Sequence, residues 1–537
     1  MNTNIKNEII KDLIKSNIKN SNDLVFLKRR IAKKYKISCP KNIELLKWYY
    51  SYLKEIKEKP SKYLEKLLKT RPVRSLSGIV NVSVLTKPYP CPGKCLYCPI
   101  EKGIPKSYIS GEPAVERAKE SNFNPYLQTQ KRIKMLKDEG HQTDKIELRV
   151  IGGTWSYYDK DYQLFFIEEC FRACNEMNLK KPKTKNNKKQ KISIKNFKKE
   201  QKKNEKAKHR IIGLSIETRP DYINEKEIKW LRELGVTMVE LGVQSIYDDV
   251  LKINRRGHSI KDTIKATKLL KDSGFKVLYQ MMPNLLGSDL KKDEEMFKEI
   301  FENPDFKPDY LKIYPCAVLK EAPLYKIFKN GEYKPYSEKE LINLLLDIKK
   351  EVPYYIRIQR IIRDISSEKI MEGGVKITNL RQILSEKMKK EGFKCKCIRC
   401  REVRENYNPK EKIYFFCDHY EASGGKEMFL SYENKDRTKL YSLLRLRIPS
   451  DPILKVLKNS AIIREIHTYG EITPIGKKKI APQHKGLGKK LIKKAEEITK
   501  NEFNLNKLSV IAGVGVRDYF RKLGFKLKDT YMVKILK

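Results

Sequence analysis

From residue 210 the chain reads RIIGLSIET (210–218), EKEIKWLRELG (225–235), MVELGVQS (238–245), IKDTIKATKLLKDSG (260–274) and KVLYQMMP (276–283). The first, third and fifth runs are rich in β-branched and other apolar residues, and the two between them have the apolar spacing of amphipathic helices. Each helical run closes on a glycine, which suits a helix C-terminus. This strand–helix repeat predicts an α/β fold with a parallel sheet.

The same alternation continues on both sides and fills residues 76–375. Four more β-rich runs belong to it: IVNVSVL (79–85), IELRVIGG (146–153), DYLKIYP (309–315) and YYIRIQRI (354–361). So many units in series favour a full or partial TIM-type barrel, in which chemistry gathers at the C-terminal ends of the strands. Glycine-rich or polar motifs follow the apolar runs at those ends: GGT (152–154), ETRP (217–220), GVQS (242–245) and MMP (281–283).

Three further regions flank or interrupt this domain. Residues 1–75 have helical periodicity and predict a small, basic helical domain. Residues 179–208 are nearly half lysine with little apolar periodicity, and they predict a mobile basic insertion. Residues 376–412 are typical of a linker. Residues 413–537 predict a last, mixed α/β domain, with β-rich runs at EMFLSYENK (427–435), LYSLLRLRIP (440–449), AIIREIHTYG (461–470) and KLSVIAGVG (507–515).

The charge balance is strongly positive: 115 Lys and Arg stand against 67 Asp and Glu, a net +48. An excess of this size favours a polyanionic partner, above all nucleic acid; the alternative is a solvated basic surface. No window of about 18 apolar residues is present, so we expect no membrane span. The first residues lack the apolar core of a secretory leader. We therefore expect a cytoplasmic protein in which the eleven cysteines form no disulfide framework and the tight cysteine clusters among them are metal sites.

One cysteine cluster lies just after the first predicted barrel strand, as Cys91-Pro-Gly-Lys-Cys95-Leu-Tyr-Cys98. Three thiolates on one tight loop can hold three irons of a 4Fe–4S cubane, which leaves the fourth iron open for a substrate with an amine and a carboxylate. A structural zinc is the alternative, but zinc takes four ligands and this loop offers no fourth.

A second cluster lies in the predicted linker, as Cys395-Lys-Cys397-Ile-Arg-Cys400. Thiolates at this spacing suit a tetrahedral zinc. Cys316, after the run 309–315, is our candidate for the fourth ligand, and other Cys and His combinations remain open. Unliganded, reduced thiols are the alternative.

A glycine-containing turn, Gln483-His484-Lys485-Gly486-Leu487-Gly488, opens the helical run that continues through Lys489 and Lys490. Backbone N–H groups and the positive end of a helix dipole at such a turn favour a pyrophosphate. A short glycine motif is weak evidence alone. Here a β-rich run ending in Glu465-Ile466-His467-Thr468 precedes it, as in GNAT acetyltransferases, where this strand pairs with the pantetheine arm of acetyl-CoA.

The CxxxCxxC loop resembles that of the radical S-adenosylmethionine (SAM) superfamily, and the likeness extends over nearly all of the chain from about residue 70. It is similar, in order, to the catalytic subunit of Elongator. The first segments that carry the resemblance are residues 71–99, NPYLQTQKRI (124–133), GHQTDKIELRVIGGTW (140–155), IETRPDY (216–222), ELGVQSIYDDV (240–250), RGHS (256–259), KDSGFKV (271–277) and MMPNLLGSDL (281–290). The last domain adds FLSYE (429–433), LLRLR (443–447), REIHTYG (464–470), QHKGLG (483–488), YFRKLGF (519–525) and YMVKIL (531–536).

The resemblance implies a set of SAM contacts. In such enzymes a reduced 4Fe–4S cluster splits SAM into methionine and a 5′-deoxyadenosyl radical. Gly152, Gly153 and Thr154 then correspond to the glycine-rich motif that binds the methionine amine. Four residues at later strand ends are candidates for ribose or carboxylate contacts, with ordinary hydrogen bonds at the barrel rim as the alternative: Glu217, Arg219, Gln244 and Ser245.

The resemblance also implies residues at the acetyl-CoA site. Tyr519 stands where GNAT enzymes keep a tyrosine near the thioester sulfur, and it is our candidate general acid for the leaving thiolate; the alternative is a packed aromatic ring. The family often has two tyrosines here, whereas this chain has Phe520 second, which puts a second hydroxyl in doubt. Lys145 matches a lysine that the family places against acetyl-CoA, and an ordinary surface lysine is the alternative.

These features imply a tRNA-modifying acyltransferase that uses acetyl-CoA and SAM to place a carboxymethyl group on C5 of the wobble uridine. The first alternative is a protein lysine acetyltransferase that uses only the last domain. The second is an RNA-binding scaffold without activity. The basic regions favour RNA over a cationic histone tail. Beyond tRNA and acetyl-CoA, the partners that remain open are Elongator-type subunits or a second copy of the chain.

Overall fold

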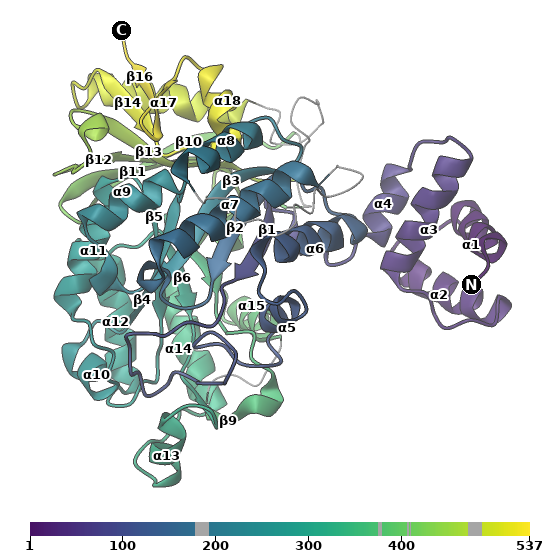
Figure 1. The fold of residues 1–537 in the computed structure, drawn as a ribbon, viewed down its shortest axis with the longest axis horizontal. Helices are drawn as coiled ribbons and strands as arrows, with labels where there is room; N and C mark the ends of the chain where they lie inside the picture. The colour runs from purple at the N-terminus through teal and green to yellow at the C-terminus, as the bar shows by residue number, and fades with distance from the viewer. Residues whose placement is uncertain (178–192, 374–378, 405–407, 409, 471–485) are drawn as a thin grey trace.

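The computed structural model describes the whole chain except residues 178–192, 374–378, 405–407, 409 and 471–485 (Figure 1). None of the described helices is both long enough and apolar enough to cross a membrane.

A seven-stranded, all-parallel sheet forms the centre of the molecule, with the strand order β1-β2-β3-β4-β5-β6-β8. The sheet does not close, because β1 and β8 are its two edges. The predicted partial barrel is therefore confirmed. Its strands are β1 (Val80–Leu85), β2 (Lys145–Ile151), β3 (Arg210–Thr218), β4 (Met238–Gln244), β5 (Lys276–Met281), β6 (Tyr310–Ile313) and β8 (Arg357–Arg360).

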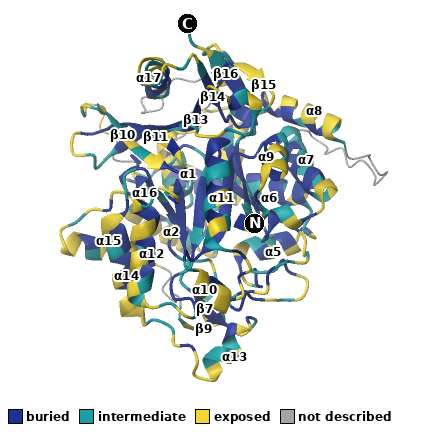
Figure 2. Ribbon diagram, turned by 90° about the vertical axis from the view of Figure 1, so that its left-hand side faces the viewer, coloured by how far each residue is buried: buried dark blue, intermediate teal, exposed yellow. Residues whose placement is uncertain are grey.

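Helices cover the outer face of this sheet, and dark blue buried strands lie between yellow helix surfaces in Figure 2. Side chains alternate along β2: Ile146, Leu148 and Val150 pack in the main hydrophobic core, while Glu147 and Arg149 line a cavity inside the barrel. The interior is polar and can therefore hold polar ligands. The larger helices around it are α6 (Pro125–Asp138), α7 (Lys160–Glu176), α9 (Glu225–Glu233), α11 (Ile260–Asp272), α12 (Leu290–Glu302) and α14 (Glu338–Glu351).

Shorter elements complete the loops at the strand ends. They are α5 (Pro113–Lys119), α10 (Asp248–Ile253), α13 (Leu324–Lys329), the two-stranded ladder of β7 (Ala317–Leu319) with β9 (Ile370–Gly373), and, in the linker region, α15 (Leu380–Lys390) and α16 (Ile398–Arg401). The sequence analysis did not predict the small ladder, because its strands are only three and four residues long.

Four N-terminal helices form a separate small core: α1 (Thr3–Lys15), α2 (Ser21–Lys34), α3 (Asn42–Glu55) and α4 (Lys62–Leu68). They confirm the predicted helical region. Lys47 of α3 reaches Asp138 at the end of α6 with a 3.0 Å ion pair. The helices stand to one side of the barrel in Figure 1.

The C-terminal domain contains a second seven-stranded sheet, in the order β10-β11-β12-β13-β14-β16-β15, and α17 (Leu487–Asn501) packs on it. It is antiparallel except for the β13–β14 pair, so the predicted mixed domain is confirmed. β10, at one edge, was missed by the sequence analysis. The strands of this sheet are β10 (Tyr414–Ala422), β11 (Gly425–Glu433), β12 (Leu440–Ile448), β13 (Ala461–Thr468), β14 (Lys507–Val510), β15 (Lys526–Lys528) and β16 (Tyr531–Ile535).

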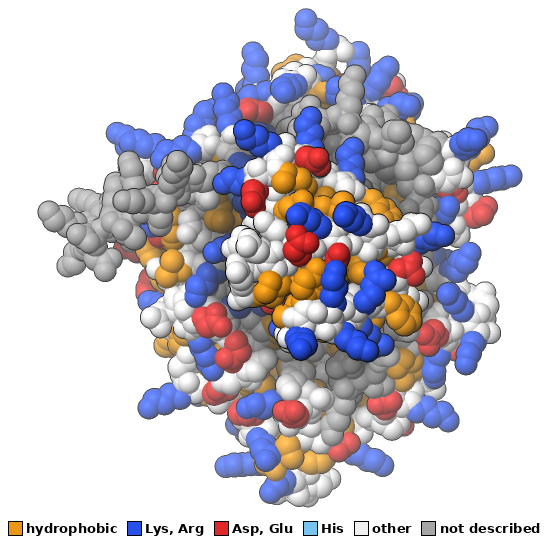
Figure 3. Space-filling model, turned by 90° about the vertical axis from the view of Figure 1, so that its right-hand side faces the viewer, with side chains coloured by type: hydrophobic (Ala, Val, Ile, Leu, Met, Phe, Trp, Pro, Cys, Tyr) orange, Lys and Arg blue, Asp and Glu red, His pale blue; other side chains and the backbone are white. Residues whose placement is uncertain are grey.

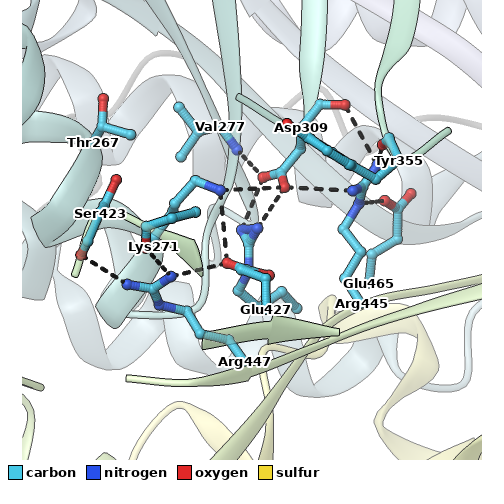
Figure 4. A network of polar contacts seen from close by, with 12 residues as sticks. Thr267, Lys271, Val277, Asp309, Tyr355, Ser423, Glu427, Arg445, Arg447 and Glu465 are labelled. Atoms are coloured by element: carbon cyan, nitrogen blue, oxygen red, sulfur yellow. Dashed lines mark hydrogen bonds and ion pairs between the residues drawn. The ribbon is translucent and has the colours of Figure 1, made fainter. Parts of the chain in front are cut away.

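Buried charges join this sheet to the barrel (Figure 4). Asp309, at the start of β6, accepts two hydrogen bonds at 2.5 and 2.8 Å from Arg464 of β13. Burial opposes ionisation of Asp309, but Arg464 and Lys271 hold its pKa below the usual value. A second anchor joins Arg447 of β12 to Asp272 at the end of α11, at 2.5 Å. Because unpairing a buried charge is costly, these contacts fix β12 and β13 against the barrel.

The predicted mobile insertion is wrong for residues 193–208, while residues 178–192 lie outside the described part. α8 (Ile194–Asn204) spans this segment, and Phe197 is fully buried against Phe171. Glu205 then pairs with Arg521 at 2.8 Å, which ties the segment to α18 (Arg517–Arg521) of the C-terminal domain. The sequence analysis missed this helix because lysines dominate the segment and Phe197 is the one aromatic residue on its buried face.

Candidate functional site: one cavity between the cysteine loop and the C-terminal sheet

A cavity of about 1230 Å³ fills the open barrel. At one end it is lined by Cys91, Cys95 and Cys98, beyond the C-terminal ends of the strands. At the other end Ile466 and His467 of β13 line it. The cysteine loop and the β13 part of the predicted acetyl-CoA site therefore face one space, whereas the described part of the turn and Tyr519 are not among its lining residues.

The cysteine loop is wrapped tightly around Gly93. A Cβ atom there would lie 2.7 Å from Arg219 Nη1, and 3.4 and 3.8 Å from the sulfurs of Cys95 and Cys91. Arg256 Nη1 is 3.7 Å from the sulfur of Cys95. Burial raises the pKa of the Cys98 thiol to about 12, and the nearby sulfur of Cys95 adds to the shift. Thiolates here need cations close by, and the two arginines supply them.

The residues fit a multi-iron cluster better than a single zinc. Four sulfurs around one zinc stand about 3.8 Å apart, given Zn–S bonds of about 2.3 Å. Among the described residues, only the second cysteine cluster brings three metal-ligand atoms within 4.8 Å of one another, so the sulfurs of Cys91, Cys95 and Cys98 are spread more widely. Three buried polar atoms beside them have no hydrogen-bond partner: the Tyr97 hydroxyl, Arg219 Nη1 and Arg256 Nε. They are donors available to a bound group.

The glycine-rich motif adjoins this loop. Gly152 has a φ of 137°, and a Cβ atom there would lie 1.9 Å from Thr86 Oγ1, so only glycine fits. The hydroxyl of Thr154 is 3.8 Å from the sulfur of Cys91. Gly153 and Thr154 both line the cavity, which places the predicted methionine-binding motif next to the cysteines.

The four strand-end candidates differ in how they are engaged. Glu217 accepts hydrogen bonds from Tyr108 at 2.8 Å and from Gln280 at 3.2 Å. Arg219 is held by Asp221 through two contacts at 2.8 and 2.9 Å. Gln244 lines the cavity at a φ of 72°. Ser245 is buried and caps the Tyr247 N–H at 3.3 Å, and it is not among the cavity residues.

The sequence analysis missed two residues at this end. Arg256 contacts Cys95. It is the first residue of RGHS (256–259), a segment that carries the family resemblance, so this signal could have identified it. Lys106 donates a hydrogen bond to the carbonyl of Gly93. No spacing rule singles out Lys106, because it approaches the loop only through the fold.

The predicted acetyl-CoA turn is partly described. Gln483, His484 and Lys485 lie outside the described residues. Gly486 begins α17 at a φ of 69°, buried Leu487 follows, and Lys489 and Lys490 are exposed. A Cβ atom at Gly488 would lie 3.3 Å from the Tyr519 hydroxyl, 3.6 Å from Ile466 Cδ1 and 3.7 Å from Thr468 Oγ1.

These contacts bring together three segments that the sequence analysis had only linked by analogy: the turn, the end of β13 and the tyrosine. Partial burial raises the pKa of Tyr519 to about 12, so its hydroxyl is a donor at neutral pH. Phe520 is buried in the C-terminal core and also lines the cavity.

Two side chains predicted to contact acetyl-CoA serve the domain interface. Glu465 accepts hydrogen bonds from Arg445 at 2.8 Å and from Tyr310 of the barrel. His467 Nε2 lies 2.6 Å from the carbonyl oxygen of Ser77, and its ring stacks on Tyr469 at 4.3 Å. At these two positions, therefore, only the backbone of β13, and not the side chains, remains a predicted contact of the cofactor.

Lys145 starts β2 and pairs in register with Arg210. The C-terminal segment Val514–Val516 packs on that neighbour, since a Cβ atom at Gly515 would lie 2.6 Å from Arg210 Cβ. Burial lowers the pKa of Lys145. Lys145 therefore lies beside a residue that the C-terminal domain contacts, but it does not line the cavity, and its contact with acetyl-CoA stays a prediction.

The second cysteine cluster forms a compact group. The sulfurs of Cys395, Cys397 and Cys400 all lie within 4.8 Å of one another, a spacing that suits three of the four ligands of a tetrahedral zinc. Lys349 of α14 donates to the sulfur of Cys400 at 3.5 Å. The structure does not bring Cys316 to them: it is fully buried in a separate apolar cluster with Leu96. Cys316 as the fourth ligand is therefore wrong.

The N-terminal region, predicted to be basic, exposes both basic and apolar side chains. Arg29 and Arg30 of α2 are exposed, and the neighbouring Phe26 is 67% exposed. Figure 3 looks onto this side of the molecule and shows Lys and Arg side chains interspersed with apolar ones.

Comparisons with known proteins agree with this architecture. The ELP3 N-terminal domain model matches residues 3–76, the Radical SAM superfamily model matches 89–300, and the Radical_SAM C-terminal domain model matches 308–390. The tRNA uridine(34) acetyltransferase of Methanocaldococcus jannaschii is 45% identical over 515 residues, which cover 93% of this chain and 91% of that protein. Elongator complex protein 3 of Homo sapiens is 36% identical, over 99% of this chain and 96% of that protein.

A solved structure is similar as well. The archaeal Methanocaldococcus infernus Elp3 with an N-terminal deletion has a TM-score of 0.74 and 43% sequence identity. The similarity covers 86% of this chain and 100% of that one.

Proposed function

The chain belongs to the Elongator complex protein 3 family, and on that premise we propose that it modifies uridine 34 of tRNA with acetyl-CoA and SAM as co-substrates. The curated relatives named tRNA uridine(34) acetyltransferase support the substrate, and the radical SAM match supports a 4Fe–4S cluster and SAM. The product is a carboxymethyl group on C5 of the uracil.

The observation that carries this proposal is the shared cavity, which reaches from the three cysteines to β13. Acyl transfer to an amine needs no one-electron chemistry. The methyl hydrogen of an acetyl thioester is difficult to remove as a proton, whereas a primary-carbon radical can take it. Radical and acetyl group must then meet in one space, and this cavity extends from the cysteines to β13.

A reduced 4Fe–4S cluster bound here would supply the one-electron chemistry for reductive cleavage of SAM to methionine and a 5′-deoxyadenosyl radical. Cys91, Cys95 and Cys98 would hold it, and Arg256 offsets thiolate charge at Cys95. The backbone of the Gly152–Thr154 motif, of which Gly153 and Thr154 line the cavity, would receive the methionine amine. Gln244 and Arg219 would orient the nucleoside part of SAM.

In the C-terminal domain, the first turn of α17 would bind the pyrophosphate of acetyl-CoA through its N–H groups. The backbone of β13 would pair with the pantetheine arm. Tyr519, whose hydroxyl lies against Gly488, would donate a proton to the CoA thiolate when the thioester is hydrolysed. Glu465 and His467 keep β13 in place through Tyr310 and Ser77.

Trideuterated acetyl-CoA tests the proposal. The protein is incubated without oxygen with bulk tRNA, SAM, a reductant and acetyl-CoA labelled on the methyl group. We expect deuterium in 5′-deoxyadenosine and the acetyl carbons in the modified uridine. Unlabelled deoxyadenosine, or full modification without acetyl-CoA, would contradict it, and acetylation of protein lysines by the C-terminal domain would then be the better assignment.

The compact group at Cys395, Cys397 and Cys400 would bind one structural zinc. Its place between the barrel and the C-terminal sheet, on the segment that holds α16 against β8, supports a structural role over a catalytic one.

A further inference from the structure

The open side of the barrel has two rims that carry arginines. Helices α5 and α6 pack beside edge strand β1, and α16 packs beside edge strand β8. Figure 2 shows α5 and α6 on one side of the strands and α15 and α16 on the other. Both rims line the cavity, through Arg117 and Arg132 on the first and Arg381 and Arg399 on the second.

The first rim concentrates positive charge. Among the described residues, no carboxylate lies within ion-pair distance of Arg117 or Arg132. Glu139, the carboxylate that acts on Arg132, is occupied by Arg74, at 2.6 and 2.8 Å, while Asp364 and Glu120 act on Arg117 only from beyond ion-pair distance. Burial lowers the pKa of Arg132 to about 10, and Arg117 and Arg74 add to that shift. The two guanidinium groups therefore stand close to like charges.

The second rim has the same imbalance. In the part of the chain that the structure describes, neither Arg381 nor Arg399 forms an ion pair. Arg399 Nε is buried and has no hydrogen-bond partner. Glu402, the carboxylate that acts on Arg399, is taken by Arg357 at 2.6 Å and by Arg404 at 2.8 Å. Arg399 lies between Cys397 and Cys400, so the compact cysteine turn presents it to the cavity.

Half-buried, unpaired guanidinium groups are costly without an anion. A guanidinium fork matches two oxygens of one phosphate and suits nucleic-acid backbones. The rims are separate and flank one cavity, so a single small anion would satisfy only one of them. A chain of phosphates satisfies both.

We propose that Arg117 with Arg132, and Arg381 with Arg399, bind two backbone phosphates of one RNA strand, on either side of the nucleotide that enters the cavity. The inference rests on the proposed function and specifies how its substrate is held. Binding the backbone on both sides of one nucleotide stabilises that nucleotide in an unstacked position, which enzymes that modify a base require.

The test uses two double variants, Arg117→Gln/Arg132→Gln and Arg381→Gln/Arg399→Gln. The probe is a synthetic RNA hairpin with an anticodon loop, and its dissociation constant is measured over a range of KCl concentrations. Each lost phosphate contact should lower the slope of log affinity against log salt by about 0.7. The matched control is Lys226→Gln/Lys229→Gln on the exposed side of α9, which also removes two charges and should keep the slope.

A second measurement separates RNA from the phosphates of CoA. Acetyl-CoA affinity should be unchanged in both double variants. Weaker acetyl-CoA binding with an unchanged RNA slope would overturn the proposal and assign the arginines to the cofactor. An unchanged slope in both double variants would also overturn it.

Charge-retaining variants guard against misfolding. Arg381→Lys/Arg399→Lys should keep the salt slope but bind the hairpin more weakly, because lysine cannot form the bidentate contact. If the lysine variant loses the slope as the glutamine variant does, the proposal fails. Since these readouts need no turnover, they stand even if the labelling experiment shows that the wild-type protein makes no modified uridine; in that case only the proposed reaction fails.

Discussion

The two cysteine triads use the same side chain for different tasks. Cys91, Cys95 and Cys98 stand at the mouth of the barrel, line the cavity and adjoin Arg219 and Arg256. Cys395, Cys397 and Cys400 lie at the linker with their sulfurs within 4.8 Å of one another. The wide triad leaves room for several metal atoms and a ligand, whereas the compact one fits a single ion.

The spacing of the cysteines explains part of this difference. A Pro-Gly-Lys segment separates Cys91 from Cys95, and Gly93 lets the loop curve around the space between the sulfurs. One residue separates Cys395 from Cys397, which brings those sulfurs together. The surroundings explain the rest: strand ends and unpaired donors adjoin the first triad, and the buried end of α14, with Lys349, adjoins the second.

Removing a wide-triad sulfur should have the largest effect. In anaerobically reconstituted protein, Cys95→Ala should abolish the 4Fe–4S absorption and all deoxyadenosine formation, because three thiolates are the minimum for the cluster. Acetyl-CoA affinity should stay within experimental error. Cys170→Ala is the matched control, since Cys170 is also buried but lies in α7 away from both triads. A Cys95 variant that keeps cluster and cleavage would show that the site is misassigned.

A change at the turn of the C-terminal domain should also stop the reaction, although the first triad is untouched. Gly488→Glu places a carboxylate against the Tyr519 hydroxyl, 3.3 Å from the Cβ position. With charge-assisted hydrogen bonds of about 1.5–3 kcal/mol at stake, acetyl-CoA should bind about 10–100-fold more weakly. The modified nucleoside should be lost at low acetyl-CoA while the iron content is kept.

The control for that variant is Lys493→Glu, which adds a carboxylate on an exposed position of the same helix. If Gly488→Glu binds acetyl-CoA normally, the turn is not the pyrophosphate site. If it binds acetyl-CoA weakly but modifies uridine at the full rate, the turn and the cysteine loop do not act in one reaction.

Disrupting the compact triad should affect stability more than chemistry. Cys397→Ser should release one zinc equivalent and lower the free energy of unfolding by at least about 3 kcal/mol, since metal loss is among the largest single-residue effects. Iron content should persist. Cys417→Ser, at a half-buried cysteine outside both triads, is the control. Metal analysis and denaturant unfolding check the prediction; loss of iron with retained zinc would reverse the roles of the triads.

The barrel, the C-terminal domain and both triads could be predicted because strand–helix periodicity and cysteine spacing are local signals. Contacts between distant segments could not. Nothing in the letters around Glu465 shows that its carboxylate meets Tyr310, and lysine-rich composition concealed the burial of Phe197. The assignment of Cys316 as a ligand failed for the same reason. Its position after a strand predicts how far along the barrel axis the residue lies, but not which side chains it contacts.

Cys316→Ala should have the smallest effect on stability and metal content. It distinguishes most clearly which of the two triads Cys316 belongs to. Cys316 is fully buried with Leu96, which stands between Cys95 and Tyr97 in the first loop, and the Leu96 carbonyl accepts from the Leu324 N–H at 2.8 Å. The thiol therefore supports the wide triad from beneath. Removing one sulfur from this packing should cost about 1 kcal/mol, leave zinc unchanged, and slightly hasten cluster loss in air. Zinc loss in this variant would restore Cys316 as a ligand of the compact triad; unchanged zinc with faster iron loss would place it beneath the first.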